Sequence, residues 1–222
     1  MQPTFIDAFS TQVRVARGDT ALVIVDMQNA TGNRNMGLGA LLSEQGKAES
    51  SAYRFDRIDH VLIPNLSRLA DTFRSCGAPV IYVTYGATLE DGSDVTAQIR
   101  GIVLATNNIE GRPEHDIVEA LTPHPGEAVL NKTTMGAFRS TAIDTLLRAK
   151  SIRNIVVGGV STNNCVAMTA MEASDSQYGV VILSDGTGTD SEEMQEASLT
   201  MLRRLWSRVM STDEVIEELT AS

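Results

Sequence analysis

Three side chains that can act as base, charge stabiliser and nucleophile follow short apolar runs of this sequence. Asp26 follows ALVIV, Lys132 comes shortly after EAVL, and Cys165 lies a few residues after NIVV, in GGVSTNNC. A thiol attacks as its thiolate, which a nearby ammonium and a helix N-terminus stabilise. A carboxylate can take the thiol proton, deliver it to a leaving amine and then activate water. Together these residue types suit acyl or carbamoyl transfer without a metal or cofactor.

The apolar runs predict strands, and the segments between most of them predict helices. Runs rich in β-branched residues occupy 21–25, 79–84, 127–130, 154–157, 179–183 and, more weakly, 207–210. Strands that are apolar along their length and alternate with helical patterns indicate a parallel sheet covered on both faces. We therefore predict a single three-layer α/β/α domain with a mainly parallel, Rossmann-like sheet of about six strands.

In such a sheet, ligands bind beyond the carboxyl ends of the strands, which is where the three candidate residues fall. Two long segments without a strong pattern, 30–60 and 86–125, are expected to wall the site. We expect Thr162 to cap the helix that carries Cys165. Two further helix starts are expected, from a capping-box spacing at Thr189 and Glu192 and from an N-cap at Thr212.

Composition disfavours several classes of function. The 222 residues carry 18 Lys and Arg against 28 Asp and Glu, and the formal charge of −10 opposes binding to nucleic acid or anionic lipid. No apolar run approaches the ~18 residues of a membrane span, and the first residues lack the apolar stretch of a signal peptide. Cys76 and Cys165 are too few for a disulfide framework. We predict a cytoplasmic protein with no membrane or nucleic-acid partner.

Each candidate residue also has a non-catalytic interpretation. A lone cysteine is commonly a small buried apolar group, and Cys76, at a helix-to-strand turn, fits that description. An aspartate after a strand can simply cap a turn, and a single lysine is commonly solvated. Only the arrival of three such residues at one sheet edge favours function. Three arginines in the first long segment are solvent-facing charges or, alternatively, anchors for a substrate carboxylate: Arg34, Arg54 and Arg57.

Three segments, LVIVDMQN, NKTTMGAF and VVGGVSTNNCVAMTAMEASDSQYGVVILSDGTG, resemble the isochorismatase-like cysteine hydrolase family. The resemblance implies a catalytic triad of Asp26, Lys132 and Cys165. It also implies a cis peptide bond between Val160 and Ser161. The backbone N–H groups of Ser161 and Cys165 would then form the oxyanion hole.

The resemblance further implies an activity and a domain organisation. The expected reaction is hydrolysis of a C–N bond in a small amide, carbamoyl or ureido compound, through a thioester on Cys165, with release of ammonia or an amine. Vinyl-ether hydrolysis of the isochorismatase type and a non-catalytic binding protein on the same fold are the alternatives. Residues 19–222 would form the hydrolase domain and residues 1–18 an N-terminal arm, in a homodimer or homotetramer.

The sequence departs from the family in ways that affect the expected ligands. Metal-binding members carry an Asp-x-His and a further histidine, a spacing absent from the three histidines here: His60, His115 and His124. We therefore predict no metal and no other cofactor. Gln28 and Asn29 follow Asp26 closely and are expected to hold either Asp26 or a substrate amide; with Arg34, they are the predicted substrate contacts. Gly136 stands where a serine is common in the family.

Overall fold

The computed structural model describes residues 13–222; residues 1–12, most of the expected arm, lie outside the described residues. The described part of that arm packs on the domain. Val15 is buried and its N–H donates to Glu218 at 3.2 Å, while the Arg17 guanidinium donates to the Leu219 carbonyl at 3.1 Å. None of the helices within 13–222 is long and apolar enough to cross a membrane.

The sheet has six parallel strands in the order β3-β2-β1-β4-β5-β6, which confirms the predicted fold class. Chain order runs outward from β1 to β2 and β3, then returns to β4 on the other side of β1. The point where the order reverses lies between β1 and β4, and polar residues follow both strands. The strands are β1 (Thr20–Val25), β2 (Val80–Tyr85), β3 (Ala128–Lys132), β4 (Asn154–Val160), β5 (Gly179–Gly188) and β6 (Arg208–Met210).

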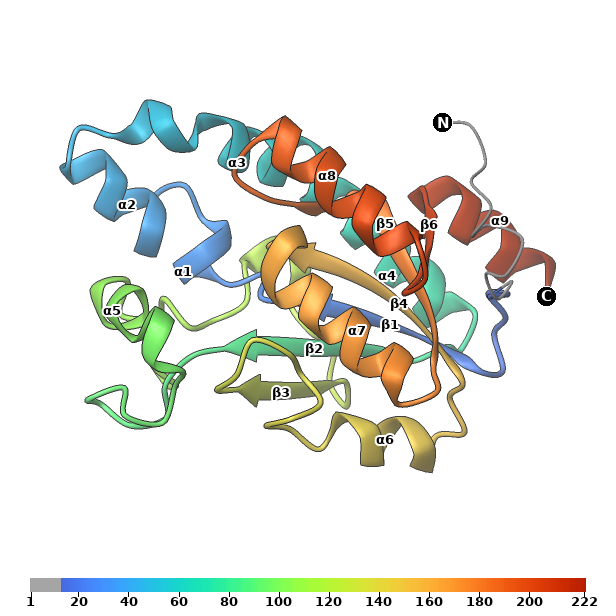
Figure 1. The fold of residues 1–222 in the computed structure, drawn as a ribbon. Helices are drawn as coiled ribbons and strands as arrows, with labels where there is room; N and C mark the ends of the chain where they lie inside the picture. The colour runs from blue at the N-terminus through green and yellow to red at the C-terminus, as the bar shows by residue number, and fades with distance from the viewer. Residues whose placement is uncertain (1–12) are drawn as a thin grey trace.

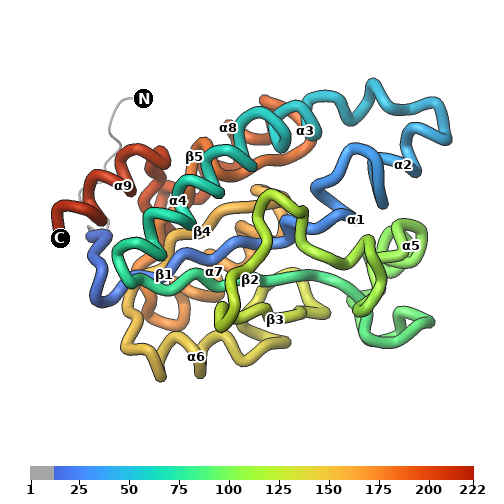
Figure 2. The backbone as a smooth tube through the Cα atoms, turned by 180° about the vertical axis from the view of Figure 1, so that it is seen from behind, coloured from blue at the N-terminus to red at the C-terminus, as the bar shows by residue number. Residues whose placement is uncertain are grey.

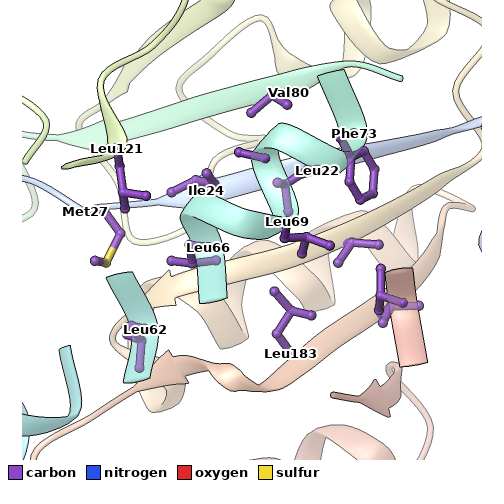
Figure 3. Packing of buried hydrophobic residues seen from close by; sticks show 14 of the residues in the cluster. Leu22, Ile24, Met27, Leu62, Leu66, Leu69, Phe73, Val80, Leu121 and Leu183 are labelled. Atoms are coloured by element: carbon purple, nitrogen blue, oxygen red, sulfur yellow. The ribbon is translucent and has the colours of Figure 1, made fainter. Parts of the chain in front are cut away.

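Helices cover both faces of the sheet, as Figures 1 and 2 show from opposite sides. On one face, α4 packs its apolar stripe onto β1, with Leu66 and Leu69 against Leu22 and Ile24 (Figure 3). On the other face, α6 and α7 bury small and branched residues against the opposite side chains of β1 and β4. The flanking helices are α4 (Ile63–Ser75), α6 (Ile143–Ala149), α7 (Ala167–Asp175), α8 (Glu192–Arg203) and α9 (Thr212–Ala221).

Two predicted helix starts are wrong by one or two residues. Ser191, not Thr189, caps α8, because its backbone is extended and its hydroxyl accepts from the N–H three residues on. Ser211, not Thr212, caps α9 and forms a capping box with Glu214. Both threonines are fully buried, with their hydroxyls bonded elsewhere, so they cannot serve the helix ends.

The two segments without a sequence pattern contain short helices. They lie beyond the ends to which the arrows of β1, β2 and β3 point, so they surround the expected site (Figure 1). Each helix is too short to show a period clearly, which is why the sequence did not indicate them. The principal ones are α1 (Asn29–Gly32), α2 (Gly37–Glu44), α3 (Ala52–Arg57) and α5 (Ala97–Ala105), with a π-helical turn, η3 (Ile58–Leu62), leading into α4.

Candidate active site

Asp26 is the first residue beyond β1 and turns the chain sharply away from the sheet. Its φ of 53° lies in the left-handed region, which aspartate tolerates better than most residues. Two hydrogen bonds hold the turn: the Asp26 N–H donates to the Val83 carbonyl at 2.8 Å, and the Thr31 hydroxyl donates to the Asp26 carbonyl at 2.7 Å. The carboxylate is therefore fixed at the carboxyl edge of the sheet, with the residue only 3% exposed.

Lys132 ends β3 and is fully buried. Its Nζ donates to Asp26 Oδ2 at 2.9 Å and lies 4.2 Å from the centroid of the Tyr85 ring. The other carboxylate oxygen, Asp26 Oδ1, is buried with no hydrogen-bond donor of good geometry among the described residues. One oxygen is thus bound to the ammonium, while the other keeps the free lone pairs that a proton acceptor needs.

Cys165 lies in a π-helical turn, η5 (Thr162–Val166), that leads into α7. The preceding Val160–Ser161 peptide bond is cis. Ser161, not Thr162, is the N-cap residue of this turn; the Thr162 hydroxyl donates to Gln195 Oε1 at 2.7 Å instead. The thiol is 3.8 Å from the sulfur of Met135, and both Asp26 and Lys132 act on it through charge and hydrogen bonding.

A glycine lets β4 bring this turn up to Asp26. Gly159 has a φ of 114°, and a Cβ there would overlap the carbonyl oxygen of Val25, the residue before Asp26. Any side chain at this position would push the end of β4 away from the end of β1. The register of β4 with β5 also shifts between Val157 and Gly159. The contact between the carboxylate and the thiol therefore depends on this glycine.

The electrostatics of the triad differ from the expected thiolate. Burial, with the nearby Asp26 charge, raises the pKa of the Cys165 thiol to about 12, and Lys132 only partly opposes this. Burial also raises the pKa of Asp26, against the effect of Lys132. Burial acts to lower the pKa of Lys132, but the neighbouring Asp26 and Cys165 outweigh it and the pKa is raised. At rest the site therefore holds a neutral thiol beside an ion pair.

The family model of the isochorismatase domain matches residues 20–214, nearly the whole described chain. This chain belongs to the isochorismatase family. The ureidoacrylate amidohydrolase RutB of Pseudomonas syringae pv. syringae is 30% identical, over 91% of this chain and 84% of its own length. An isochorismatase family protein from Desulfovibrio vulgaris has a TM-score of 0.74 at 27% identity, covering 92% and 98% of the two chains. A cysteine hydrolase from Pseudomonas syringae pv. phaseolicola, 24% identical with coverages of 96% and 97%, has the same fold with a TM-score of 0.77.

Gln28, a predicted substrate contact, is fully buried in this isochorismatase-family domain. Its side-chain amide makes its hydrogen bonds within the protein. Its Oε1 accepts from the Tyr85 N–H at 2.8 Å, and its Nε2 donates to the His115 carbonyl at 2.7 Å and to Asn108 Oδ1 at 3.2 Å. Asn108 Nδ2 donates in turn to the Tyr85 carbonyl at 2.6 Å. The amide of Gln28 therefore fixes the end of β2 beside Lys132.

Sequence reasoning did not identify Tyr85, Asn108 or His115 as part of the site. Burial lowers the pKa of His115, so this imidazole is neutral at pH 7. Tyr85 directly follows the predicted strand 79–84 and ends β2 in the structure, so its position could have singled it out, but Asn108 and His115 come from a segment without any pattern.

The remaining predicted contacts lie in different surroundings. Asn29 donates to the Pro113 carbonyl at 3.0 Å, and Arg34 forms exposed ion pairs with two surface aspartates. Arg54 is the buried arginine of the set. It donates to the Ser161 hydroxyl at 2.8 Å and to the Thr31 carbonyl at 3.0 Å, so it joins the turn after Asp26 to the turn before Cys165.

A cavity of about 890 Å³ opens on the opposite face of β2 and β3 from Lys132. Thr84 and Asn131, whose side chains alternate with those of Tyr85 and Lys132, line it together with His115. The triad does not line this cavity; Cys165 reaches solvent through its own 8% exposed surface. Within residues 13–222, no cluster of three or more His, Cys, Asp or Glu side chains could hold a metal ion.

Proposed function

We propose that this protein is a cysteine-dependent amidohydrolase that cleaves the C–N bond of a small amide, carbamoyl or ureido compound. The observation that carries the proposal is the meeting of Asp26, Lys132 and Cys165 at one sheet edge, with a 2.9 Å contact between the carboxylate and the ammonium. The likeness to a ureidoacrylate amidohydrolase, at 30% identity over most of the chain, supports the ureido class of substrate.

The first step forms a thioester and releases the amine. Cys165 Sγ bonds to the substrate carbonyl carbon while the thiol proton passes to Asp26, and the carbonyl oxygen becomes an oxyanion. The N–H groups of Ser161 and Cys165 are the proposed donors to that oxyanion. When the tetrahedral species collapses, the C–N bond breaks, and Asp26 returns the proton to the leaving nitrogen as ammonia or an amine departs.

The second step hydrolyses the thioester. Asp26 takes a proton from water as the water oxygen bonds to the carbonyl carbon. The C–S bond then breaks, and the proton returns to Cys165 Sγ, which restores the neutral thiol. Lys132 acts in both steps, because its buried positive charge lowers the energy of the thiolate as it forms and departs.

Because the resting thiol is neutral, attack must be coupled to proton transfer. A thiol with a pKa of about 12 has almost no thiolate at pH 7. The free Oδ1 of Asp26 supplies the acceptor at the moment of attack. The proposed mechanism is therefore general-base catalysis by Asp26 rather than attack by a preformed thiolate.

Ammonia release across a panel of carboxamides, ureas and N-carbamoyl acids tests the proposal. We expect at least one class to be hydrolysed, and we expect Cys165→Ala to abolish that turnover. The denatured acyl-enzyme should carry the acyl mass on Cys165 in mass spectra. Full activity of Cys165→Ala would contradict the thioester mechanism, and no hydrolysis anywhere in the panel would contradict the proposed substrate class.

We also propose that the protein is a cytoplasmic homodimer or homotetramer without a nucleic-acid partner. The formal charge of −10 supports the last point, and a thiol nucleophile works best in a reducing compartment. Three large apolar side chains, each more than 40% exposed, support self-association: Met194 and Met201 lie seven residues apart on one face of α8, and Leu205 follows in the turn after it.

A further inference from the structure

The Lys132 ammonium has an unusual set of neighbours. It is fully buried, so bulk water does not reach its three N–H donors. One donor is bonded to Asp26 Oδ2 at 2.9 Å, and Cys165 is a second hydrogen-bond neighbour. Tyr85 presents the face of its ring to the same nitrogen, 4.2 Å from the ring centroid. A buried cation without compensating partners is costly, so the ring matters to the position of this charge.

Tyr85 itself is held at several points. Its N–H donates to Gln28 Oε1 at 2.8 Å, and its carbonyl accepts from Asn108 Nδ2 at 2.6 Å. The phenolic oxygen is 3.2 Å from the Thr96 hydroxyl. Because Tyr85 and Lys132 are register partners on β2 and β3, their side chains emerge on the same face of the sheet. The ring is thus a rigid surface on which the ammonium rests.

We propose that Tyr85 is a positioning residue that, through its ring face, holds the Lys132 ammonium between Asp26 and Cys165. The lysine side chain has four rotatable carbon–carbon bonds, so removing the ring opens space into which the ammonium can move away from the sulfur. The Tyr85 hydroxyl is bonded to the Thr96 hydroxyl rather than to Lys132, so the proposal requires only the ring. The inference rests on the proposed role of the triad.

The charged and titratable groups around this ammonium come from three elements. Asp26 faces it from the turn after β1, Cys165 from the turn before α7, and Tyr85 from β2. His115, from the segment before η4 (Glu119–Leu121), lies near Asp26, and burial lowers its pKa. A change in the position of the ammonium must therefore change the reactivity of the thiol, because the ammonium stabilises the thiolate.

The experiment compares two substitutions of Tyr85 in a Cys76→Ala background, where Cys165 is the only thiol. Tyr85→Phe keeps the ring, and Tyr85→Leu removes it. Tyr82→Leu is the matched control, because Tyr82 is also a buried tyrosine of β2 but packs on the opposite face of the sheet. The rate of Cys165 alkylation by iodoacetamide is measured against pH, and kcat and KM are measured with the best compound of the panel.

We expect Tyr85→Phe to match the parent within about twofold in alkylation and kcat, because the ring remains. Tyr85→Leu should be alkylated about 10- to 30-fold more slowly at a given pH below the thiol pKa, with a similar loss in kcat. Tyr82→Leu should lower the thermal midpoint while leaving the alkylation profile unchanged. If Tyr85→Leu does not fold, Tyr85→Met serves as the second ring-free variant.

Three results would overturn the inference. The first is a parental alkylation profile in the ring-free variant, and the second is a loss in Tyr85→Phe as large as in Tyr85→Leu. The third is an equal shift in Tyr82→Leu, which would show a general effect of lost packing. If the parent hydrolyses no compound of the panel, the proposed function fails, but the alkylation profiles still decide the role of Tyr85.

Discussion

At the scale of single residues, the two oxygens of the Asp26 carboxylate have separate partners. Oδ2 accepts from Lys132, which favours the charged form of the carboxylate, and Oδ1 is buried without a donor of good geometry. Burying a carboxylate oxygen unpaired costs stability, and such a cost is typically found where function requires it. Because burial raises the pKa of Asp26, the carboxylate is also a stronger base than an exposed aspartate.

This basicity predicts the acid side of the pH profile. The base form of Asp26 is the ionised one, so activity appears as pH rises through its pKa and is lost as pH falls through it. Since that pKa is raised, kcat/KM should decline on acidification at a pH above the ordinary aspartate value of about 3.9. The measurement is kcat/KM against pH with the best panel compound, and a midpoint at or below the ordinary value would contradict it.

Replacing Asp26 with asparagine separates the effect of the carboxylate charge from the effect of side-chain shape. Asp26→Asn keeps the side-chain size but removes the proton acceptor, so kcat should fall about 10²- to 10⁴-fold. Any residual rate should no longer decline on acidification. The variant leaves Lys132 buried with a neutral partner, so circular dichroism and a thermal midpoint must accompany the kinetics. If a residual rate still declined at acidic pH, a group other than Asp26 would be responsible for that decline.

At the scale of elements, Arg54 of α3 joins the two turns that carry the triad. Its guanidinium binds the Thr31 carbonyl and the Ser161 hydroxyl, and it also pairs with Asp190 before α8, at 3.0 Å. Thr31 in turn donates to the Asp26 carbonyl. A single buried side chain therefore sets the spacing between the carboxylate turn and the thiol turn.

Because Arg54 sets this spacing, its replacement is expected to lower kcat. Arg54→Met should lower kcat by about 10- to 100-fold, since small misplacements of reacting groups are costly. It should also reduce the free energy of unfolding by about 1–3 kcal/mol, because the partly buried Thr31 carbonyl loses its donor. Arg68→Met is the control: Arg68 forms an exposed ion pair, so both quantities should stay near parental values in kinetics and urea unfolding. Parental kcat in Arg54→Met would contradict the positioning role.

The sequence predicted the strands and the three candidate residues better than the surroundings of those residues. All six strands were predicted, because continuous apolar runs in alternation with helical patterns leave few other arrangements. Asp26, Lys132 and Cys165 could be brought together since each follows a strand. The burial of Arg54 could not be predicted, because Arg54 and its partner Thr31 both belong to short helices without a period. The direction of the thiol pKa was wrong because sequence gives the nearby charges but not the depth of burial.

At the scale of the whole molecule, the proposed self-association can be tested on the apolar face of α8. Light scattering of the parent should give a mass of two or four chains. A double substitution, Met201→Glu with Leu205→Glu, should reduce that mass, because it places charges on side chains that are 41% and 63% exposed in the single chain. Both side chains are exposed, so the fold should persist by circular dichroism. A monomeric parent would contradict the proposal.

The neutral resting thiol has a consequence for survival under oxidative stress. Peroxide oxidises thiolates far faster than thiols, and the first product, a sulfenic acid, opens the way to irreversible damage. A nucleophile whose pKa lies near 12 offers peroxide almost no reactive form between turnovers. In the proposed mechanism, the burial that makes Cys165 dependent on its neighbouring carboxylate also protects the sulfur between turnovers.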